Sequence, residues 1–199
     1  MVLVVNPGRI PATSSREFIA HLKSKPGEVN YGSGGNGTIL HLATDLVLEA
    51  AGVSAKHIPY KGVGPMVTDL LGGQIDFATA AMPSVQGQIK AGTLRAIGLL
   101  SAQRMAAAPE IPTFAEQGLT NFSVEAWFAV IGPKGMTAAA VKRAHDAVVA
   151  AFKDGAVMEA MAKQGNTINV GTPEQAQSAF QTELAKYAAL VKKVGLQVQ

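Results

Sequence analysis

The sequence predicts an α/β fold in which strands and helices alternate around a parallel, doubly wound sheet. Short apolar strands alternate with amphipathic helices over the first 100 residues. Hydrophobic residues make up 48% of the 199-residue chain, which is enough for a substantial core. Ligands of such sheets bind beyond the carboxyl ends of the strands, where a glycine-rich turn lies in this sequence.

The first half of the chain supplies the expected βα units. Ser14 and Glu17 form a capping box at a helix start, and Gly52 ends a second helix whose apolar residues recur at helical spacing. The expected elements are a strand at 1–5, a helix from Ser14 to Pro26, a strand at 28–31, a helix from Thr38 to Gly52, a strand at 56–60, a helix at 63–71, a strand at 75–79, a short helix from Pro83 and a strand at 94–100.

The pattern changes after residue 100. A stretch rich in alanine, proline and turn residues leads to an expected strand at Val124–Ile131, followed by helices from 137 to 152, near 156–164 and from Thr172 to about 194. These helices have few strands of their own on which to pack. Connections near Asn6 and near 121–126 bracket the first half, which resembles a domain inserted between two crossings of a hinge.

Composition narrows the classes of partner. The chain has no cysteine, so thiolate metal sites and disulfides are excluded. The net charge of +3 is scattered and aromatic residues are 6% of the chain, which disfavours a nucleic-acid partner. A mild positive bias suits small anionic solutes. No apolar run approaches the ~20 residues of a membrane span, and residues 1–5 do not resemble a signal peptide.

The glycine-rich turn at 32–37 is the most informative stretch of the chain. It links an expected strand to an amphipathic helix that begins at Thr38. Glycines let the backbone approach a ligand closely, and the helix start presents unpaired N–H groups with the positive end of the helix dipole behind them. This combination predicts an anion site built from main chain.

Other interpretations of the turn remain open. Its letters satisfy G-x-G-x-x-G, but the strand at 56–60 lacks the carboxylate that a dinucleotide site needs. A second interpretation is a turn that only connects the strand to the helix. Tyr31 occupies the position of the first glycine of a nucleophile elbow, and Ser33 has no base at a recognisable spacing, so nucleophilic catalysis is unsupported.

Further polar residues are candidates for the same site. His41 lies one turn into the helix, and Tyr60 and Lys61 follow the next strand. His41 and Asp45 have the i, i+4 spacing of two metal ligands, but no third ligand is evident, so no metal is expected. Trp127 fits a hinge-packing role better than a ligand contact. The remaining histidines are scattered and are interpreted as structural or solvated: His21, His57 and His145.

An ordered set of short motifs resembles the Bug-type extracytoplasmic solute receptors of tripartite tricarboxylate transporters. The motifs are Val-Val-Asn-Pro at 4–7, Lys-Pro-Gly-Glu-Val-Asn-Tyr at 25–31, Gly-Asn-Gly-Thr at 35–38, Pro-Tyr-Lys-Gly at 59–62, Thr-Asp-Leu-Leu-Gly-Gly-Gln-Ile-Asp at 68–76, Ile-Lys-Ala-Gly-Thr-Leu-Arg-Ala at 89–96 and Pro-Glu-Ile-Pro-Thr-Phe-Ala-Glu-Gln-Gly at 109–118.

The resemblance implies a periplasmic-binding-protein-like fold of two α/β lobes joined by a hinge. It implies that 5–123 is one complete ligand-binding lobe, and that 1–4 and 124–199 are hinge strands and the C-terminal part of another lobe whose N-terminal part is missing. Full-length members are periplasmic and carry a signal peptide, which this chain lacks. An N-terminally truncated chain is therefore expected, with apolar faces that favour self-association.

The resulting functional prediction is a non-catalytic receptor for small di- or tricarboxylates that feeds a tripartite tricarboxylate transporter, without a cofactor. The expected ligand-binding residues are Ser33, Gly34, Gly35, Asn36, Gly37, Thr38, His41, Tyr60, Lys61 and Ala80. Where many relatives place an acidic residue, this chain has Ala80, which disfavours amino-acid ligands. The alternative is a nucleotide- or phosphate-binding α/β enzyme that uses the Gly32–Gly37 loop.

Overall fold

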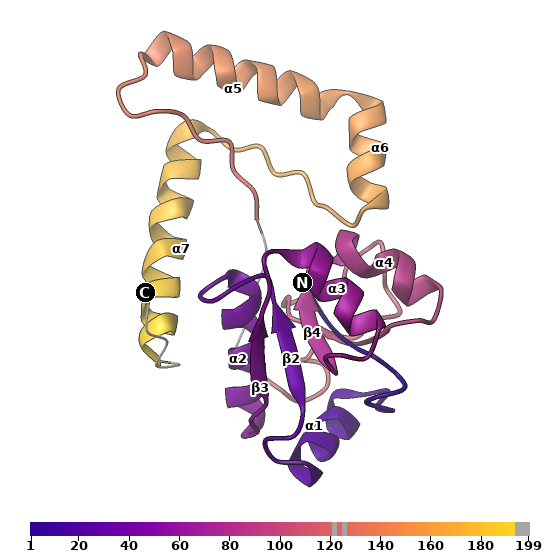
Figure 1. The fold of residues 1–199 in the computed structure, drawn as a ribbon. Coiled ribbons are helices and arrows are strands. Elements are labelled where there is room, and N and C mark those ends of the chain that lie inside the picture. Colours follow the sequence, from indigo (N-terminus) through magenta and orange to yellow (C-terminus); the bar gives the residue numbers. More distant parts are fainter. Residues whose placement is uncertain (121–122, 125–126, 194–199) are drawn as a thin grey trace. The chain divides into compact units, whose positions relative to one another are not determined.

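The computed structural model describes residues 1–120, 123–124 and 127–193 (Figure 1). The chain divides into two compact units, one of Met1–Ala126 with Val191–Gln199 and one of Trp127–Leu190. Residues 1–4, which the sequence assigned to a hinge, lie in the first unit and are buried there. The correspondence of these units to two lobes of a receptor stays a prediction.

The first unit contains a five-stranded sheet of order β3-β2-β4-β1-β5. The strands are β1 (Val2–Val5), β2 (Asn30–Ser33), β3 (Lys56–Pro59), β4 (Phe77–Ala80) and β5 (Arg95–Leu99). β2 runs parallel to both β3 and β4, as expected.

The sheet is mixed, which corrects the expectation of a purely parallel sheet. β1 lies between β4 and β5 and is antiparallel to both. The alternation of elements predicts a uniform series of crossovers, but β1 is not the neighbour of β2, the next strand in the chain. All four residues of β1 are buried, so its direction cannot be inferred from an apolar pattern.

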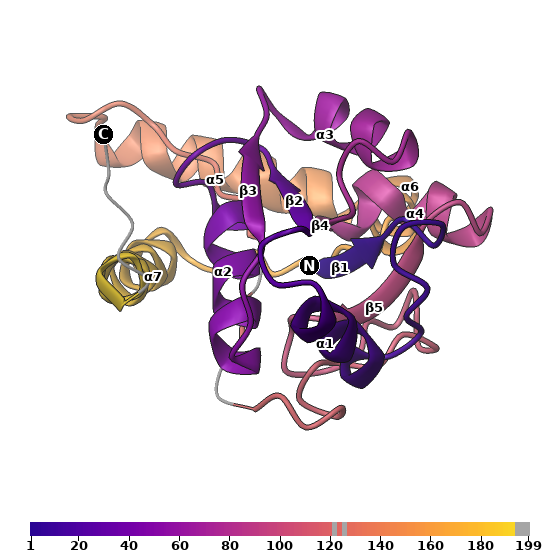
Figure 2. The same ribbon diagram turned by 60° about the horizontal axis from the view of Figure 1, so that its bottom comes forward.

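Four helices cover the two faces of this sheet (Figure 2). They are α1 (Ser15–Ser24), α2 (Ile39–Ala51), α3 (Val63–Leu71) and α4 (Met82–Lys90). The side chains of β4 show which helices cover which face, because alternate side chains of a strand point to opposite faces. Phe77 packs edge-on against Phe18 of α1, and the Thr79 hydroxyl lies 2.9 Å from the Thr44 hydroxyl of α2.

The other face of β4 is apolar. Ala78 and Ala80 are fully buried in a core cluster that includes Met66 of α3 and Val85 of α4. The cores on the two sides of the sheet fix α2 and α3 relative to the strands that precede them. The predicted caps are present: the Ser14 hydroxyl accepts a hydrogen bond from the Glu17 N–H, and Gly52 ends α2 in the left-handed conformation.

The second unit contains α5 (Ala138–Lys153), α6 (Gly155–Lys163) and most of α7 (Pro173–Lys193). Neither α5 nor α6 has a buried residue. The predicted strand at 124–131 is wrong for its described residues, 124 and 127–131, which form no strand. Phe128, Val130 and Ile131 are largely exposed, because in the described chain no neighbouring strand receives this apolar run. None of the described helices has the length and apolar character needed to cross a membrane.

Candidate ligand-binding site

Three parallel strands end at the same edge of the sheet, and each is followed by a helix. The pairs are β2 with α2, β3 with α3, and β4 with α4. The turn after β3 lies against the glycine loop, since the Tyr60 N–H donates to the Ser33 carbonyl at 3.0 Å and the Gly62 N–H donates to the Gly34 carbonyl at 3.2 Å. The structure thus brings the predicted segments 33–38 and 60–62 together.

Two positions of the loop require glycine, each for a different structural reason. A Cβ at Gly32 would lie 2.5 Å from Ile75 Cδ1 and 2.8 Å from Met66 Cγ, so a side chain there would collide with the core. Gly37 adopts a φ of +71°, in the left-handed region that most residues avoid. The loop therefore needs glycine both for packing beneath it and for its own turn.

The loop uses some of its N–H groups internally and leaves others open. Gly35 donates to the Ser33 hydroxyl at 3.2 Å, and Gly37 donates to His41 Nδ1 at 3.1 Å. Thr38 donates to the Gly35 carbonyl at 3.3 Å. Within the described chain, four N–H groups at the loop and the start of α2 have no partner: those of Gly34, Asn36, Ile39 and Leu40. They are the main-chain donors that an anion can engage.

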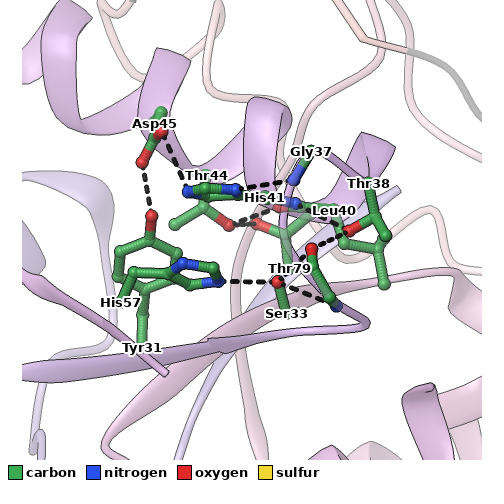
Figure 3. A network of polar contacts seen from close by, with 11 residues as sticks. Tyr31, Ser33, Gly37, Thr38, Leu40, His41, Thr44, Asp45, His57 and Thr79 are labelled. Carbon is green, nitrogen blue, oxygen red and sulfur yellow. Dashed lines mark hydrogen bonds and ion pairs between the residues drawn. The ribbon is translucent and has the colours of Figure 1, made fainter. Parts of the chain in front are cut away.

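Beneath the loop lies a network of polar side chains from β2, β3 and α2 (Figure 3). The imidazoles of His41 and His57 are stacked, with centroids 3.7 Å apart and planes inclined by 16°. His57 Nε2 lies 2.7 Å from the Ser33 hydroxyl, and His41 Nε2 lies 3.3 Å from Asp45 Oδ2. The Tyr31 hydroxyl donates to the other oxygen of Asp45. The loop is thus connected through two histidines to the sheet and to α2.

Burial favours the neutral form of both imidazoles. Desolvation lowers the pKa of His57 to about 4, with a further contribution from the neighbouring His41. Desolvation also lowers the pKa of His41, although the Asp45 carboxylate acts in the opposite direction. A neutral His41 satisfies its contacts in one tautomer, in which Nδ1 accepts from Gly37 and Nε2–H donates to Asp45.

The structure distinguishes exposed predicted residues from buried ones. Asn36, Gly37 and Lys61 are exposed, and Gly34, Gly35 and Thr38 are partly exposed. Lys61 makes no ion pair or side-chain hydrogen bond within the described chain. The Thr38 hydroxyl donates to the Gly35 carbonyl at 2.8 Å and caps α2. These residues are the accessible members of the candidate site.

Four predicted residues are engaged elsewhere or buried. Ser33 is fully buried and donates to the Gly35 carbonyl, and both nitrogens of His41 are occupied. The Tyr60 hydroxyl donates to Asp69 at 2.9 Å, and burial together with this carboxylate raises the pKa of Tyr60 to about 12. Ala80 points into the apolar core and does not face the loop. The polar groups of Ser33, His41 and Tyr60 are thus engaged within the chain, and Ala80 has none, so their assignment as direct ligand contacts stays a prediction.

Sequence reasoning missed His57, Tyr31 and Asp45 as members of this network. It also found no base near Ser33, whereas His57 is in hydrogen-bond contact with it. The information that would have revealed this network is the register of the two strands, because Tyr31 of β2 pairs with His57 of β3. That register is not readable from either strand alone. In the described chain, no group of three or more histidine, aspartate or glutamate side chains is arranged to hold a metal ion.

Comparison with solved structures shows the same fold. The chain superposes on an R. palustris protein solved with adipate with a TM-score of 0.93 and 27% identity, over 98% of this chain and 65% of that one. It superposes on the periplasmic binding protein BugD with a TM-score of 0.92 and 28% identity, over 100% of this chain and 67% of that one. The periplasmic-binding-protein-like fold class is therefore confirmed.

Sequence comparison gives the family. Protein BugT of Bordetella pertussis is 37% identical over 199 residues, which are 100% of this chain and 61% of BugT. The chain thus spans about three fifths of this relative. The family model described as "Tripartite tricarboxylate transporter family receptor" matches residues 1–196. These matches show that the chain belongs to the TctC family of tripartite tricarboxylate transporter receptors.

Proposed function

We propose that this chain binds small organic carboxylates as part of a receptor that feeds a tripartite tricarboxylate transporter. The observation that carries the proposal is the set of four unpartnered N–H groups at the loop and at the first turn of α2. A helix start with open N–H groups favours an anion, and no negatively charged side chain is present within 33–41 to compete for them. Family membership and the adipate in one structural neighbour support a carboxylate as that anion.

In this proposal, the main chain recognises one carboxylate and exposed side chains complete the site. The N–H groups of Gly34, Asn36, Ile39 and Leu40 hold the oxygens, and Lys61 supplies a positive charge beside the loop.

The starts of α3 and α4 have no side-chain cap, and they follow strands that end at the same edge. At the start of α3, the N–H groups of Val63 and Gly64 have no partner within the described chain and are available to a second carboxylate of the same ligand. The start of α4 offers less, because Pro83 has no N–H and the Ser84 N–H donates to the Ala81 carbonyl.

Catalysis is not part of the proposed role. The only hydroxyl paired with an imidazole within the described network is that of Ser33, which is fully buried and cannot attack a bound substrate. The alternative nucleotide-binding enzyme gains no support from this contact. The proposed location is the periplasm and the proposed partners are the membrane components of the transporter, in line with the family and with BugD, a periplasmic binding protein.

A matched pair of ligands tests the proposal. Adipate and its neutral diamide, adipamide, have nearly the same shape, but only adipate carries the charges that the open N–H groups favour. Titration calorimetry of the full 199-residue chain is expected to show binding of adipate and none of adipamide. At about 100 times its Kd, adipate should stabilise the chain by about 2.7 kcal/mol in thermal unfolding.

Two results would count against this function. Equal binding of adipate and adipamide would mean that the site does not distinguish a charged ligand from a neutral one. Stabilisation by NAD or ATP, but by none of adipate, succinate or citrate, would favour the nucleotide-binding alternative.

A further inference from the structure

Each histidine beneath the glycine loop holds it through one particular ring nitrogen. His41 uses Nδ1, which accepts the Gly37 N–H at 3.1 Å. His57 uses Nε2, which lies 2.7 Å from the Ser33 hydroxyl, and the same hydroxyl accepts the Gly35 N–H at 3.2 Å. One loop N–H, that of Gly37, is therefore held by an imidazole directly, and another, that of Gly35, is held by a hydroxyl that an imidazole contacts.

The surrounding residues leave these rings little freedom to turn. The His57 ring stacks on both His41 and Tyr31, and the Tyr31 ring centroid lies 4.9 Å from it at an inclination of 26°. Asp45 accepts from the outer nitrogen of His41, and the Tyr31 hydroxyl fixes the Asp45 carboxylate. His41 is 7% exposed, and Thr44 ties the same turn of α2 to Thr79 of β4 at 2.9 Å. The pair is consequently a rigid support on which the loop rests (Figure 3).

Rigid support matters because the open and the engaged N–H groups alternate along the loop. Gly34 and Asn36 are open, whereas Gly35 and Gly37 between and beside them are engaged by the support. Fixing the amides of Gly35 and Gly37 fixes the loop backbone, and with it the positions of the open amides of Gly34 and Asn36. Preorganised donors bind a ligand without the entropic cost of ordering the loop.

We propose that His41 and His57 are positioning residues of the ligand loop, and that each acts through one specified nitrogen, Nδ1 of His41 and Nε2 of His57. This inference rests on the proposed carboxylate-binding function for its link to affinity. Its claim about loop shape is independent of any ligand. The groups that face the pair are Tyr31 from β2 and Asp45 from α2, and both contact the rings or their partners directly.

Amide substitutions at the two positions give a crossed test. The amide of asparagine lies as many bonds from Cβ as Nδ1 does, and the terminal amide of glutamine lies as many bonds from Cβ as Nε2 does. His41→Asn and His57→Gln therefore keep the nitrogen position that the loop uses. His41→Gln and His57→Asn are the mismatched controls, with the same chemistry at the wrong distance.

The readouts are adipate affinity by calorimetry and amide hydrogen exchange of Gly35 and Gly37 by NMR. The mismatched variants are expected to lose about tenfold in affinity, and the matched variants about threefold or less, as for the loss of one hydrogen bond. Exchange at Gly37 should accelerate about tenfold in His41→Gln relative to His41→Asn, and exchange at Gly35 should accelerate similarly in His57→Asn relative to His57→Gln.

A general packing role predicts a different pattern, in which the same amide ranks first at both positions. That result, or equal behaviour of all four variants, would overturn the proposal. If the wild-type chain does not bind adipate, the proposed function fails, but the exchange rates still decide the positioning role. Should the variants not fold, nitrogen NMR of the wild-type chain decides it, because a protonated Nδ1 on His41 near neutral pH would contradict the inference.

Discussion

Thr38 shows how a single side chain serves the site from within the loop. The sequence predicts that its hydroxyl contacts a carboxylate, and this remains a proposal. In the structure the hydroxyl donates to the Gly35 carbonyl at 2.8 Å and accepts from the first turn of α2. Because its hydrogen is already used, we propose that Thr38 influences a ligand through the conformation of the loop.

Replacement of Thr38 by valine should therefore affect both stability and binding. Thr38→Val keeps the shape of the side chain but removes the cap, which is expected to lower the free energy of unfolding by about 0.5–2 kcal/mol. Adipate affinity should fall by about tenfold because the loop loses one internal hydrogen bond. Urea denaturation and calorimetry measure the two effects, with Thr38→Ser as the control that retains the hydroxyl. Unchanged affinity in the valine variant would show that Thr38 does not contribute to ligand binding.

Substitution by aspartate is expected to have opposite effects on stability at Ala80 and at its neighbour Ala81. Its side chain is fully buried in the apolar face of β4, so Ala80→Asp would place a carboxylate in the core. A loss of several kcal/mol in unfolding free energy, on the order of 2–7, is expected. At the next residue, Ala81 is the uncapped N-cap of α4, and Ala81→Asp should gain about 0.5–2 kcal/mol.

Chemical denaturation of both variants checks this pair. A stable Ala80→Asp variant with altered ligand preference would restore the earlier interpretation, in which position 80 reads the ligand.

At the scale of elements, the helices and most strands of the first unit follow from local patterns. The spacing of apolar residues and the residues at Thr38 and Gly52 predicted α2 and its ends. What local patterns do not contain is which strands are neighbours and in which register. The stacked histidines arise from the pairing of β2 with β3 and the packing of α2 above them, so they could be predicted only after the sheet order was known.

The same pairing gives the chain a specific pH dependence. Burial lowers the pKa of His57 from 6.5 to about 4, and the pKa of His41 is lowered too. The unfolded chain therefore takes up protons at a higher pH than the folded chain. Stability from this source is complete above about pH 6.5 and is lost as the pH falls towards 4.

His57→Gln removes one of these proton-binding groups, so its unfolding free energy should fall less steeply between pH 6.5 and 4 than that of the wild type. Urea unfolding at a series of pH values measures the slopes. Parallel curves for wild type and His57→Gln would show that His57 is not buried as a neutral ring.

At the scale of the whole molecule, sequence and structure agree best where residues are buried. The first unit was predicted almost element by element, because its strands and helices bury apolar faces against one another. The direction of β1 was missed because a fully buried strand carries no pattern that reports its direction. The predicted strand at 124–131 failed in its described part, because β-forming residues alone do not make a strand without a neighbour to pair with.

The two units should consequently differ in local stability. Every residue of β1 and β4 is buried, whereas α5 and α6 contain no buried residue. Amides exchange through local opening where few apolar groups are buried, and only through global unfolding in a packed core. Isolated helices of about 12–15 residues or fewer are marginal in water, and α6 has 9 residues. We expect exchange in α5 and α6 to be at least ~100-fold faster than in β1 and β4, as hydrogen exchange with mass spectrometry would measure.

The exposed helix α4 of the first unit is the internal control, because it shares solvent exposure but packs Met82 and Val85 into the core. Protection in α5 and α6 equal to that of β4 would mean that the second unit has a stabilising core that its exposed side chains do not reveal.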